Sequence, residues 1–444
     1  MSLYHPSVYQ WAAPVDSYWE ATAPPFDKAV PLREGEQCDV AIIGGGYTGL
    51  SAAYHLAKEF GMDVRLLEAG PIAWGASGRN GGFCSLHPSS LGYDDLIRRF
   101  GLDEAKRYVG SQVEAIEFVR DLLAREKIEA DCQGDGVFEV AHDEKRFAHL
   151  AEEADLLGKT FGLPVKLMSA DEFGEIGYRS TEQFGALWKG AGFGLHPLKF
   201  ARGLAGLAAD AGVKLHAHAR VQDWTTARGR HVLQTDAGTL RAGKVIVATN
   251  GFTRDDLHPA FSGRLLPVMS NIFTTRPLTE EELAAQNWRT ECPCSNTRNL
   301  LFYYRVLPDR RVLFGARGDL TGHPKASEKM FHWLKGRFGE VFPAWQGIEI
   351  THFWRGLVCM APNLTPAIGA LEDDPTVFYG LAFHGDGVAA APWTGRELAR
   401  LAAGRRAASD LPAALRGPLP RLPLPGLRRW YLRAALAYYR WKDR

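Results

Sequence analysis

Cysteine, net charge and long apolar runs are all scarce in this sequence. Its 444 residues hold six cysteines, too few and too scattered for a disulfide framework, so a reducing compartment is expected. Cys292 and Cys294 form the one close pair, and no histidine cluster accompanies them, so no metal site is expected. Lysine and arginine total 52 against 51 aspartate and glutamate, so no overall field favours nucleic acid or a membrane as partner.

Targeting signals are also missing. No apolar run reaches the roughly 18 residues of a transmembrane helix, and the N-terminus lacks the charged-then-apolar pattern of a secretory signal. We therefore expect a cytoplasmic protein without a transmembrane segment. No internal repeat is visible. A hydrophobic content of 46% and a charged content of 23% are typical of a globular protein, and the length suits two domains.

Glycine is abundant, and three glycines follow an apolar run near the N-terminus. Asp39–Ile43 is a strand pattern that leads into Gly44, Gly46 and Gly49, at the spacing G-x-G-x-x-G. Apolar residues then recur at helical spacing up to Ala57. In such a unit the first glycine allows the tight turn, the second lets the backbone approach a pyrophosphate, and the third lets the helix pack on the sheet.

A second strand pattern, Val64–Leu67, ends at Glu68, which lies 24 residues after Gly44 (68 minus 44). A carboxylate at this place hydrogen-bonds ribose hydroxyls, and the helix that begins with Tyr47 and Thr48 offers its free N–H groups to phosphates. Glycines alone are weak evidence, because loops are rich in glycine. Strand, glycines, helix, strand and acid in register together predict a dinucleotide-binding βαβ unit.

Three later stretches fit the same domain. Residues 74–83 hold four glycines, a serine and an asparagine, which predicts a loop pressed against the dinucleotide. Lys244–Gly251 is a buried strand that ends in small residues and glycine. The strand from Val377 runs into glycines at 385 and 387, and a helix is expected over Val388–Ala403, with its N-terminus available to a ligand.

The remaining patterns predict a second, mixed sheet and several helices. Helices are expected over Leu102–Arg125, Glu144–Leu157, Pro197–Ala211 and Ser327–Phe338, and strands over Gly136–Val140, Val213–Val221, Leu265–Thr275, Leu301–Arg305 and Val312–Ala316, with a hairpin of His231–Thr235 and Thr239–Arg241. The predicted domains are an N-terminal arm (1–34), a discontinuous nucleotide domain (35–95, 195–262 and 352–410), a substrate domain (96–194 and 263–351) and a basic, aromatic tail (411–444).

The two ends of the chain carry aromatic residues. The arm is expected to lie across the body or a partner subunit rather than to form a disordered tail. Residues 430–440 form a basic amphipathic helix pattern, for which packing on its own domain is favoured over contact with a membrane or a partner. Both ends are candidate interfaces for an oligomer.

The βαβ unit with Glu68, the loop at 75–82, the end of the strand at 247–251 and the helix start at 385–388 together resemble the D-amino-acid-oxidase-like flavoproteins. The arm motif Ser17–Ala21 belongs to the same resemblance, which covers most of the chain. Within these flavoproteins the sequence is most similar to the branch that holds γ-glutamylputrescine oxidase, sarcosine oxidase and glycine oxidase.

This resemblance implies an α/β fold, in which a glutathione-reductase-type Rossmann domain binds FAD and an inserted α+β substrate domain carries a mixed sheet. It implies a small amine or amino acid as substrate, hydride transfer from that substrate to the flavin, hydrolysis of the resulting imine, and reoxidation by oxygen or another acceptor. The residues it implies for FAD are Gly44, Gly46, Tyr47, Thr48, Gly49, Glu68, Ala69, Gly75, Ala76, Ser77, Gly78, Arg79, Asn80, Gly81, Gly82, Val221, Ala248, Thr249, Asn250, Gly251, Gly385, Asp386, Gly387 and Val388.

No catalytic triad is expected, because the protein mainly positions and desolvates the amine. The catalytic candidates are Arg79, Tyr304, Trp354 and His384, and the further pocket candidates are Asn80, His87, Tyr303, Arg305 and Arg317. Residues 303–305 follow one another on a strand, so only alternate side chains face the flavin.

Two departures from the family pattern matter. Sarcosine oxidases use a lysine near the flavin for oxygen activation, and the comparable strand Pro267–Ile272 has none, which leaves oxidase and dehydrogenase both open. Cys359 and Met360 resemble the pair through which monomeric sarcosine oxidases attach FAD covalently. A buried, unlinked cysteine and non-covalent FAD are the favoured interpretation.

Two other functions stay open. A nicotinamide-dependent dehydrogenase would use the same βαβ unit, but it leaves the loop at 75–82 and the helix start at 385–388 without a role. A flavin-binding subunit that works only within a larger oxidase would use the arm and the tail as interfaces.

Overall fold

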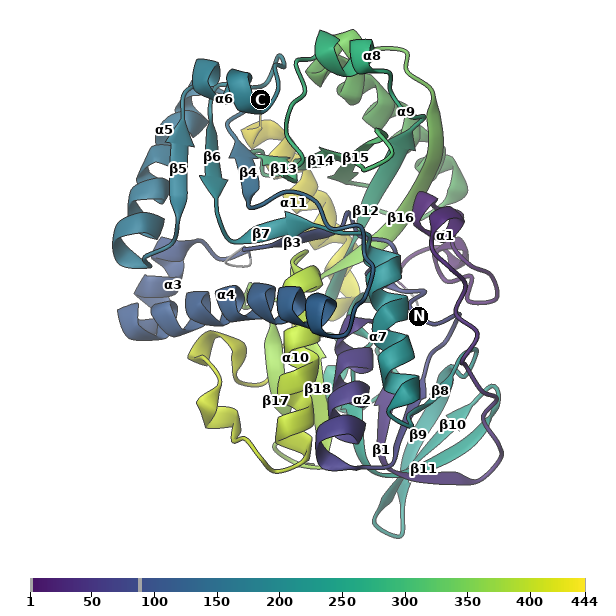
Figure 1. Cartoon of the computed structure of the whole chain (residues 1–444). Helices are drawn as coiled ribbons and strands as arrows, with labels where there is room; N and C mark the ends of the chain where they lie inside the picture. The colour runs from purple at the N-terminus through teal and green to yellow at the C-terminus, as the bar shows by residue number, and fades with distance from the viewer. Residues whose placement is uncertain (1–2, 87–89, 444) are drawn as a thin grey trace.

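The computed structural model describes residues 3–86 and 90–443. Two large sheets lie one above the other in Figure 1, and the small pair β3 (Phe83–Ser85) and β7 (Gly192–Gly194) lies between them. This is the α/β architecture with a second, mixed sheet that the sequence predicts.

The lower sheet joins strands that are far apart in the sequence. Its order is β17 (Ala367–Ala370), β18 (Val377–Leu381), β11 (Gly238–Val247), β1 (Glu36–Ile43), β2 (Val64–Leu67) and β8 (Lys214–His216), with the hairpin β9 (Val221–Ala227) and β10 (Arg230–Thr235) extending from β11. β1 runs parallel to β2 and β11, and β18 runs parallel to β11. The carboxyl ends of these parallel strands therefore meet at one edge, where α/β proteins bind ligands.

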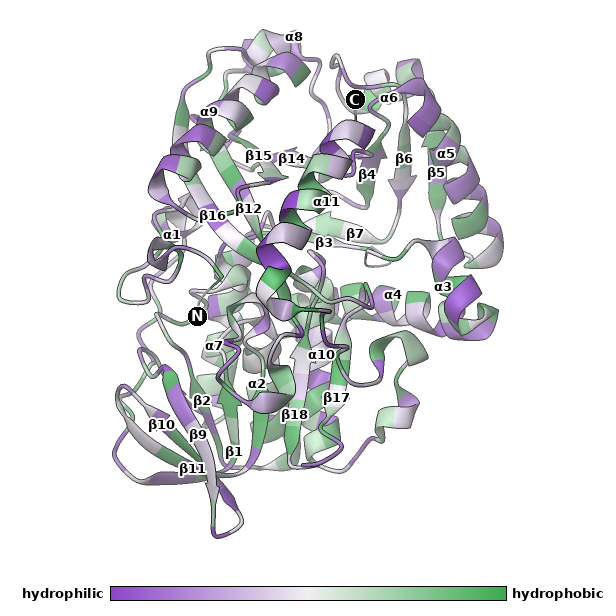
Figure 2. Cartoon of the chain, turned by 180° about the vertical axis from the view of Figure 1, so that it is seen from behind, coloured by the Kyte–Doolittle hydropathy of each residue, from purple (hydrophilic) through white to green (hydrophobic). Residues whose placement is uncertain are grey.

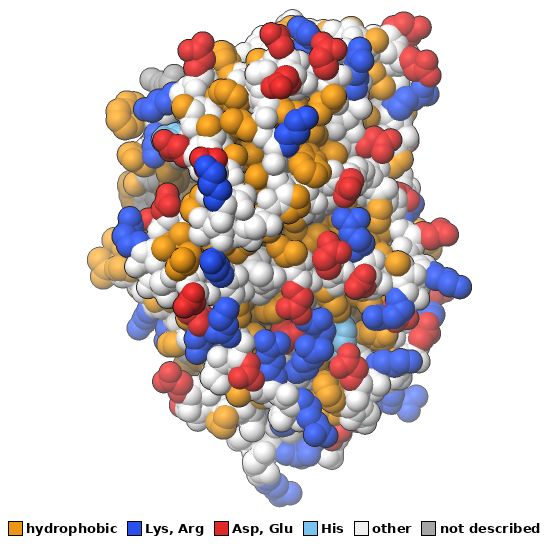
Figure 3. Space-filling model, turned by 60° about the vertical axis from the view of Figure 1, so that its left-hand side comes forward, with side chains coloured by type: hydrophobic (Ala, Val, Ile, Leu, Met, Phe, Trp, Pro, Cys, Tyr) orange, Lys and Arg blue, Asp and Glu red, His pale blue; other side chains and the backbone are white. Residues whose placement is uncertain are grey.

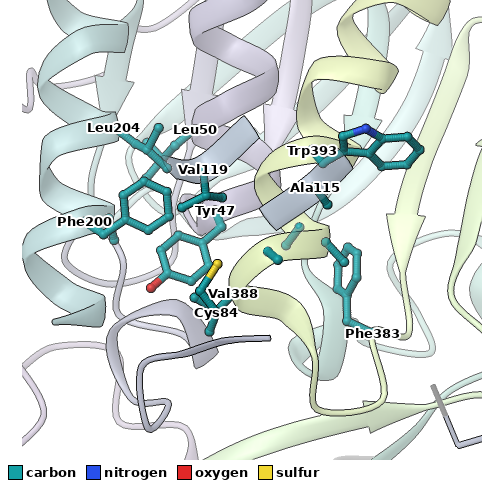
Figure 4. Close-up of a cluster of buried hydrophobic side chains, with 14 of the residues drawn as sticks. Tyr47, Leu50, Cys84, Ala115, Val119, Phe200, Leu204, Phe383, Val388 and Trp393 are labelled. Carbon is teal, nitrogen blue, oxygen red and sulfur yellow. The ribbon is translucent and has the colours of Figure 1, made fainter. Parts of the chain in front are cut away.

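Four helices cover this sheet and share one core. They are α2 (Tyr47–Phe60), α4 (Leu102–Arg125), α7 (Pro197–Asp210) and α10 (Gly387–Ala402). Figure 4 shows Tyr47 and Leu50 of α2 against Phe200 and Leu204 of α7, with Val119 of α4 beside them. The core fixes the N-terminal ends of α2 and α10 beside the carboxyl edge of the sheet.

The upper sheet has the order β16 (Ile350–Met360), β12 (Leu266–Thr275), β15 (Val312–Arg317), β14 (Phe302–Val306), β13 (Cys294–Asn296), β4 (Val137–Val140), β6 (Ala186–Lys189) and β5 (Val165–Met168). The other helices are α1 (Tyr18–Thr22), α3 (Tyr93–Phe100), α5 (Glu144–Asp155), α6 (Ala170–Ile176), α8 (Glu280–Ala285), α9 (Pro324–Val341) and α11 (Arg428–Lys442). A buried aromatic cluster, which includes Phe314 and Phe338, packs α9 on this sheet.

The structure differs from the predicted elements at three places. The single strand predicted over Val213–Val221 is two strands, because His218 adopts a left-handed backbone (φ 54°) and its N–H donates to Gly70 O. The predicted hairpin arm Thr239–Arg241 and the predicted strand Lys244–Gly251 are one strand, β11, which pairs with β10 on one side and with β1 on the other. Finally, α4 packs on α10, one of the helices that cover the lower sheet, although the residues of α4 fall in the range predicted for the substrate domain.

Both ends of the chain pack on the body. In the arm, Tyr4, Val8 and Trp19 are buried, and the Trp19 indole donates to Asn80 O at 2.8 Å. Two leucines of α11 are buried as well. Within residues 3–86 and 90–443, no helix has the length and apolarity needed to cross a membrane, and no three His, Cys, Asp or Glu side chains come together as a metal ion would require.

Candidate cofactor and substrate site

A cavity of about 290 Å³ lies between the two sheets. The turn after β1, the loop after β2 and the first turn of α10 form one side, and β12, β14 and β16 form the other. The predicted cofactor residues that line it are Gly44, Gly46, Tyr47, Thr48, Glu68, Ala69, Gly75, Ala76, Ser77, Arg79, Asn80, Gly81, Val221, Ala248, Thr249, Asn250, Gly385, Asp386, Gly387 and Val388.

The glycine turn after β1 has the tight geometry that the motif requires. Gly44 has a φ of +111°, a conformation that side chains disfavour. A Cβ on Gly49 would lie 2.0 Å from Gly44 O, so no other residue fits where α2 crosses the turn. A Cβ on Gly46 would lie 2.7 Å from Ser77 Oγ, which accepts the N–H of Tyr47 at 2.9 Å. The turn therefore leaves the first amides of α2 beside the cavity.

The Glu68 carboxylate is buried at one end of this cavity. Its oxygens accept the backbone N–H groups of Gly45 (2.7 Å) and Gly70 (3.1 Å). Burial raises the pKa of Glu68, although these two amides oppose the shift. Trp11 of the arm and Phe252 line the same end, and their rings lie 5.7 Å apart. This end therefore pairs a hydrogen-bond acceptor with flat apolar surfaces.

Arg79 lies in the glycine-rich loop, with its guanidinium 3.8 Å from the centre of the Trp74 ring. Its Nε donates to Trp74 O at 2.8 Å and its Nη1 to Arg355 O at 3.2 Å, whereas its Nη2 has no hydrogen-bond partner within the described structure. Burial lowers the pKa of Arg79 to about 9. A buried cation with an unsatisfied donor suits a site that holds an acceptor group.

The opposite end of the cavity carries hydroxyl groups and a second, half-buried cation. Tyr303 from β14 and Ser270 from β12 share a hydrogen bond of 2.7 Å between their hydroxyl oxygens. Arg317, at the end of β15, donates to His384 O at 3.2 Å. Burial lowers the pKa of Arg317, against the opposing effect of Asp386. Apolar side chains such as Ile272 and Leu301 complete this end.

The sequence matches the family model described as "DAO: FAD dependent oxidoreductase" over residues 39–401. The chain belongs to this family. It is therefore an FAD-dependent oxidoreductase, and the resemblance to D-amino-acid-oxidase-like flavoproteins is confirmed. This also removes the nicotinamide-dependent dehydrogenase as a rival interpretation.

Two curated relatives cover almost the whole chain. The gamma-glutamylputrescine oxidoreductase of Escherichia coli (strain K12) is 32% identical over 437 residues, which is 96% of this chain and 98% of the relative. A probable oxidoreductase, OrdL, of Rhizobium meliloti (strain 1021) is 29% identical over 98% of this chain and 99% of its own. Among solved structures, glycine oxidase from Geobacillus kaustophilus has a TM-score of 0.70 at 22% identity, covering 87% of this chain and 100% of that one. This likeness shows that the fold is shared.

The residues of this DAO-family cavity fit FAD. The N-terminal end of α2 suits the pyrophosphate, and the Glu68 carboxylate suits the ribose hydroxyls. The backbone of the glycine-rich loop lies along the cavity, and the first turn of α10 lines the end of the cavity near Arg317. Individual contacts to FAD stay predictions.

Four predicted cofactor glycines do not line the cavity, because they pack against backbone or side chains behind it. A Cβ on Gly78 would lie 2.4 Å from Ala73 O, and one on Gly82 would lie 1.9 Å from Leu195 O. Gly251 packs beside Leu357, and Gly49 crosses the turn described above. In this structure they shape the site from outside.

Three of the four catalytic candidates are placed away from the cavity. Tyr304 points to the other face of β14, where its hydroxyl lies 2.5 Å from that of Tyr178. Trp354 lies behind the loop and donates to Arg79 O at 2.8 Å. The His384 ring lies beside Ser90 (3.1 Å) and accepts Ala361 N at 3.3 Å. None of these three candidates lines the cavity in this structure, whereas Arg79 does, and the catalytic role of each stays a prediction.

The further candidates divide in the same way. Asn80, Tyr303 and Arg317 line the cavity, whereas Arg305 lies beneath the loop and donates to the carbonyls of Gly81 (3.2 Å) and Leu195 (2.5 Å). His87 lies outside the described residues. Sequence reasoning missed Ser270, Trp11 and Phe252; only the period-two pattern of the strand over 265–275 would have placed Ser270 on a cavity face.

Cys359 also lines the cavity and is buried, and burial raises the pKa of its thiol. A raised pKa keeps the sulfur protonated and therefore a poor nucleophile. This agrees with the favoured interpretation that FAD is held without a covalent link, which stays a prediction. Among the described residues that line the cavity, the positively charged side chains are all arginines, and none is a lysine.

Proposed function

We propose that this enzyme oxidises the C–N bond of a small amine that carries a carboxylate. The observation that carries the proposal is the end of the cavity where the half-buried Arg317 lies near the Tyr303 and Ser270 hydroxyls. A guanidinium that lines a cavity in this way suits a bidentate carboxylate. The gamma-glutamylputrescine oxidoreductase relative makes γ-glutamylputrescine the first candidate, and glycine, sarcosine and other N-methyl amino acids share its amine and carboxylate.

FAD, when bound, accepts a hydride from the carbon next to the substrate nitrogen, and the resulting imine hydrolyses. The chain supplies binding and desolvation. Arg317 holds the carboxylate, the hydroxyls of Tyr303 and Ser270 orient the amine, and apolar side chains such as Ile272 and Leu301 exclude water. Exclusion of water favours the neutral amine, whose lone pair assists loss of the hydride.

The test is anaerobic bleaching of the flavin absorption band with matched pairs of amines. γ-Glutamylputrescine is compared with putrescine, and sarcosine with methylamine, because each pair differs by the group that carries the carboxylate. We expect rapid bleaching by one carboxylate-bearing member and none by its partner. If no amine of the panel reduces the flavin, the protein is better explained as a partner-dependent flavoprotein subunit. Where an amine does bleach the flavin, oxygen uptake by the reduced enzyme distinguishes an oxidase from a dehydrogenase.

Two neighbouring tyrosines provide a matched pair of variants. Tyr303→Phe removes a hydroxyl that lines the cavity, and we expect kcat/KM to fall roughly tenfold with little change in Tm. Tyr304→Phe removes a hydroxyl in the core and leaves that of Tyr178 without its partner, which is expected to cost about 1–3 kcal/mol of stability while kcat/KM is kept. If Tyr304→Phe lost activity at an unchanged Tm, the substrate would contact the face of β14 that carries Tyr304, and the face proposed here would be wrong.

A further inference from the structure

The C-terminal helix α11 has two very different faces. Its inward face holds Leu432 and Leu436, which are buried against Val268 and Met269 of β12 and Leu357 of β16. In Figure 2 the helix lies diagonally across the near side of the molecule, in front of these strands. The inward face therefore packs on its own protein, as the sequence favours.

The helix is also fixed at both ends. At its start, Arg428 pairs with Asp255, with Nη1 3.1 Å from Oδ1. At its end, the Asp443 carboxylate accepts the backbone N–H groups of Asn299 and Leu300, each at 2.8 Å. Because both ends are held, the outward face keeps one orientation relative to the body.

The outward face is aromatic and basic. Trp430 and Trp441 are 63% and 69% exposed, and Tyr438 is 52% exposed. Arg433, Arg440 and Lys442 are exposed beside them, and the helix contains no acidic residue. Asp443, the residue that follows the helix, accepts hydrogen bonds from Asn299 and Leu300. On the face shown in Figure 3, basic and acidic side chains are mixed.

We propose that α11 docks the enzyme on an anionic lipid surface, with the helix lying flat at the interface. Interfacial helices combine Trp and Tyr, which lie at the headgroup level, with Arg and Lys, which pair with anionic headgroups. Each cation near such a surface contributes about 1 kcal/mol. The chain carries a net charge of only +1, so this attraction is local to the helix and not a property of the whole molecule.

A second copy of the chain is a poorer occupant of this face. A two-fold contact centred on this face would place α11 against α11, because such a contact uses the same patch on both partners. The cations of the two helices would then face one another without a free carboxylate between them, which disfavours association. An anionic membrane supplies the missing negative charge.

The test is flotation of the holoenzyme with vesicles of phosphatidylcholine alone or mixed with phosphatidylglycerol. We expect flotation with the mixed vesicles only, weakened by salt. Charge reversal of Arg433, Arg440 and Lys442 to Glu is expected to weaken binding more than about tenfold. The matched control reverses the exposed Lys106, Lys145 and Lys166 to Glu, which changes the net charge equally on other faces and should leave binding intact.

Flavin absorbance and Tm of each free variant show whether the fold is kept, so a misfolded variant is recognised as such. Trp430→Ala and Trp441→Ala together should weaken flotation without any change of charge. The proposal is overturned if the wild type ignores anionic vesicles, if both charge reversals weaken binding equally, or if light scattering shows a dimer that only the α11 variant loses. The last result would assign the face to a second copy.

Discussion

Replacing Gly49 by alanine is expected to abolish retention of FAD. The added Cβ would lie 2.0 Å from Gly44 O and 3.2 Å from the Ile42 side chain, so either α2 or the turn has to move. Overpacking of this kind costs up to about 3 kcal/mol, and here it would also displace the N-terminal end of α2, which is predicted to face the pyrophosphate. The ratio of flavin to protein absorbance and the Tm of the purified variant measure both effects.

Gly206→Ala is the matched control, since Gly206 lies within helix α7 and a Cβ there meets nothing within 4 Å. Alanine is the better helix former, so this variant should keep its flavin and gain up to about 1 kcal/mol of stability. If Gly49→Ala retained full flavin and an unchanged Tm, the close crossing of α2 over the turn would be wrong, and with it the basis for the pyrophosphate site.

The βαβ unit could be predicted from sequence because its signals are local. Strand, turn and helix are adjacent in the chain, and the glycine at position 49 is required by a contact with a residue only five positions away, Gly44. The position of the Glu68 carboxylate beside the turn follows from the parallel pairing of β1 and β2, which the short crossover between them enforces. Local order of this kind leaves few alternative arrangements.

The choice between Tyr303 and Tyr304 could not be made in the same way. Alternation along β14 predicts that the two side chains face opposite sides, but only the neighbouring elements decide which side holds the cavity. Here the helix α9 and its aromatic cluster cover one face of β14, and Tyr304 is buried in that cluster. Tyr303 therefore lies on the opposite face, which lines the cavity. The placement of Trp354 depends likewise on a hydrogen bond to a loop 275 residues away in the sequence.

The removal of the half-buried Arg317 cation should separate carboxylate binding from the chemistry of oxidation. Arg317→Gln keeps much of the side-chain volume and loses the charge at the end of the cavity proposed to bind the substrate. Loss of one partner from a buried charge pair costs about 2–5 kcal/mol, which corresponds to a fall in kcat/KM of roughly thirty-fold to a few thousand-fold. The carboxylate-bearing amine that bleaches the flavin is the substrate to measure, and the flavin content should stay at the wild-type level.

Arg355→Gln is the matched control for this change. Arg355 is also a largely buried cation and comes from β16, but it pairs with Asp319 at 3.0 Å and lies outside the cavity lining. We expect it to keep kcat/KM, whereas Arg317→Lys, which keeps the charge but not the bidentate geometry, should recover part of the lost activity. An Arg317→Gln enzyme that still discriminates sarcosine from methylamine, or γ-glutamylputrescine from putrescine, would show that another group binds the carboxylate. The proposed substrate class would then have to be argued from that group instead.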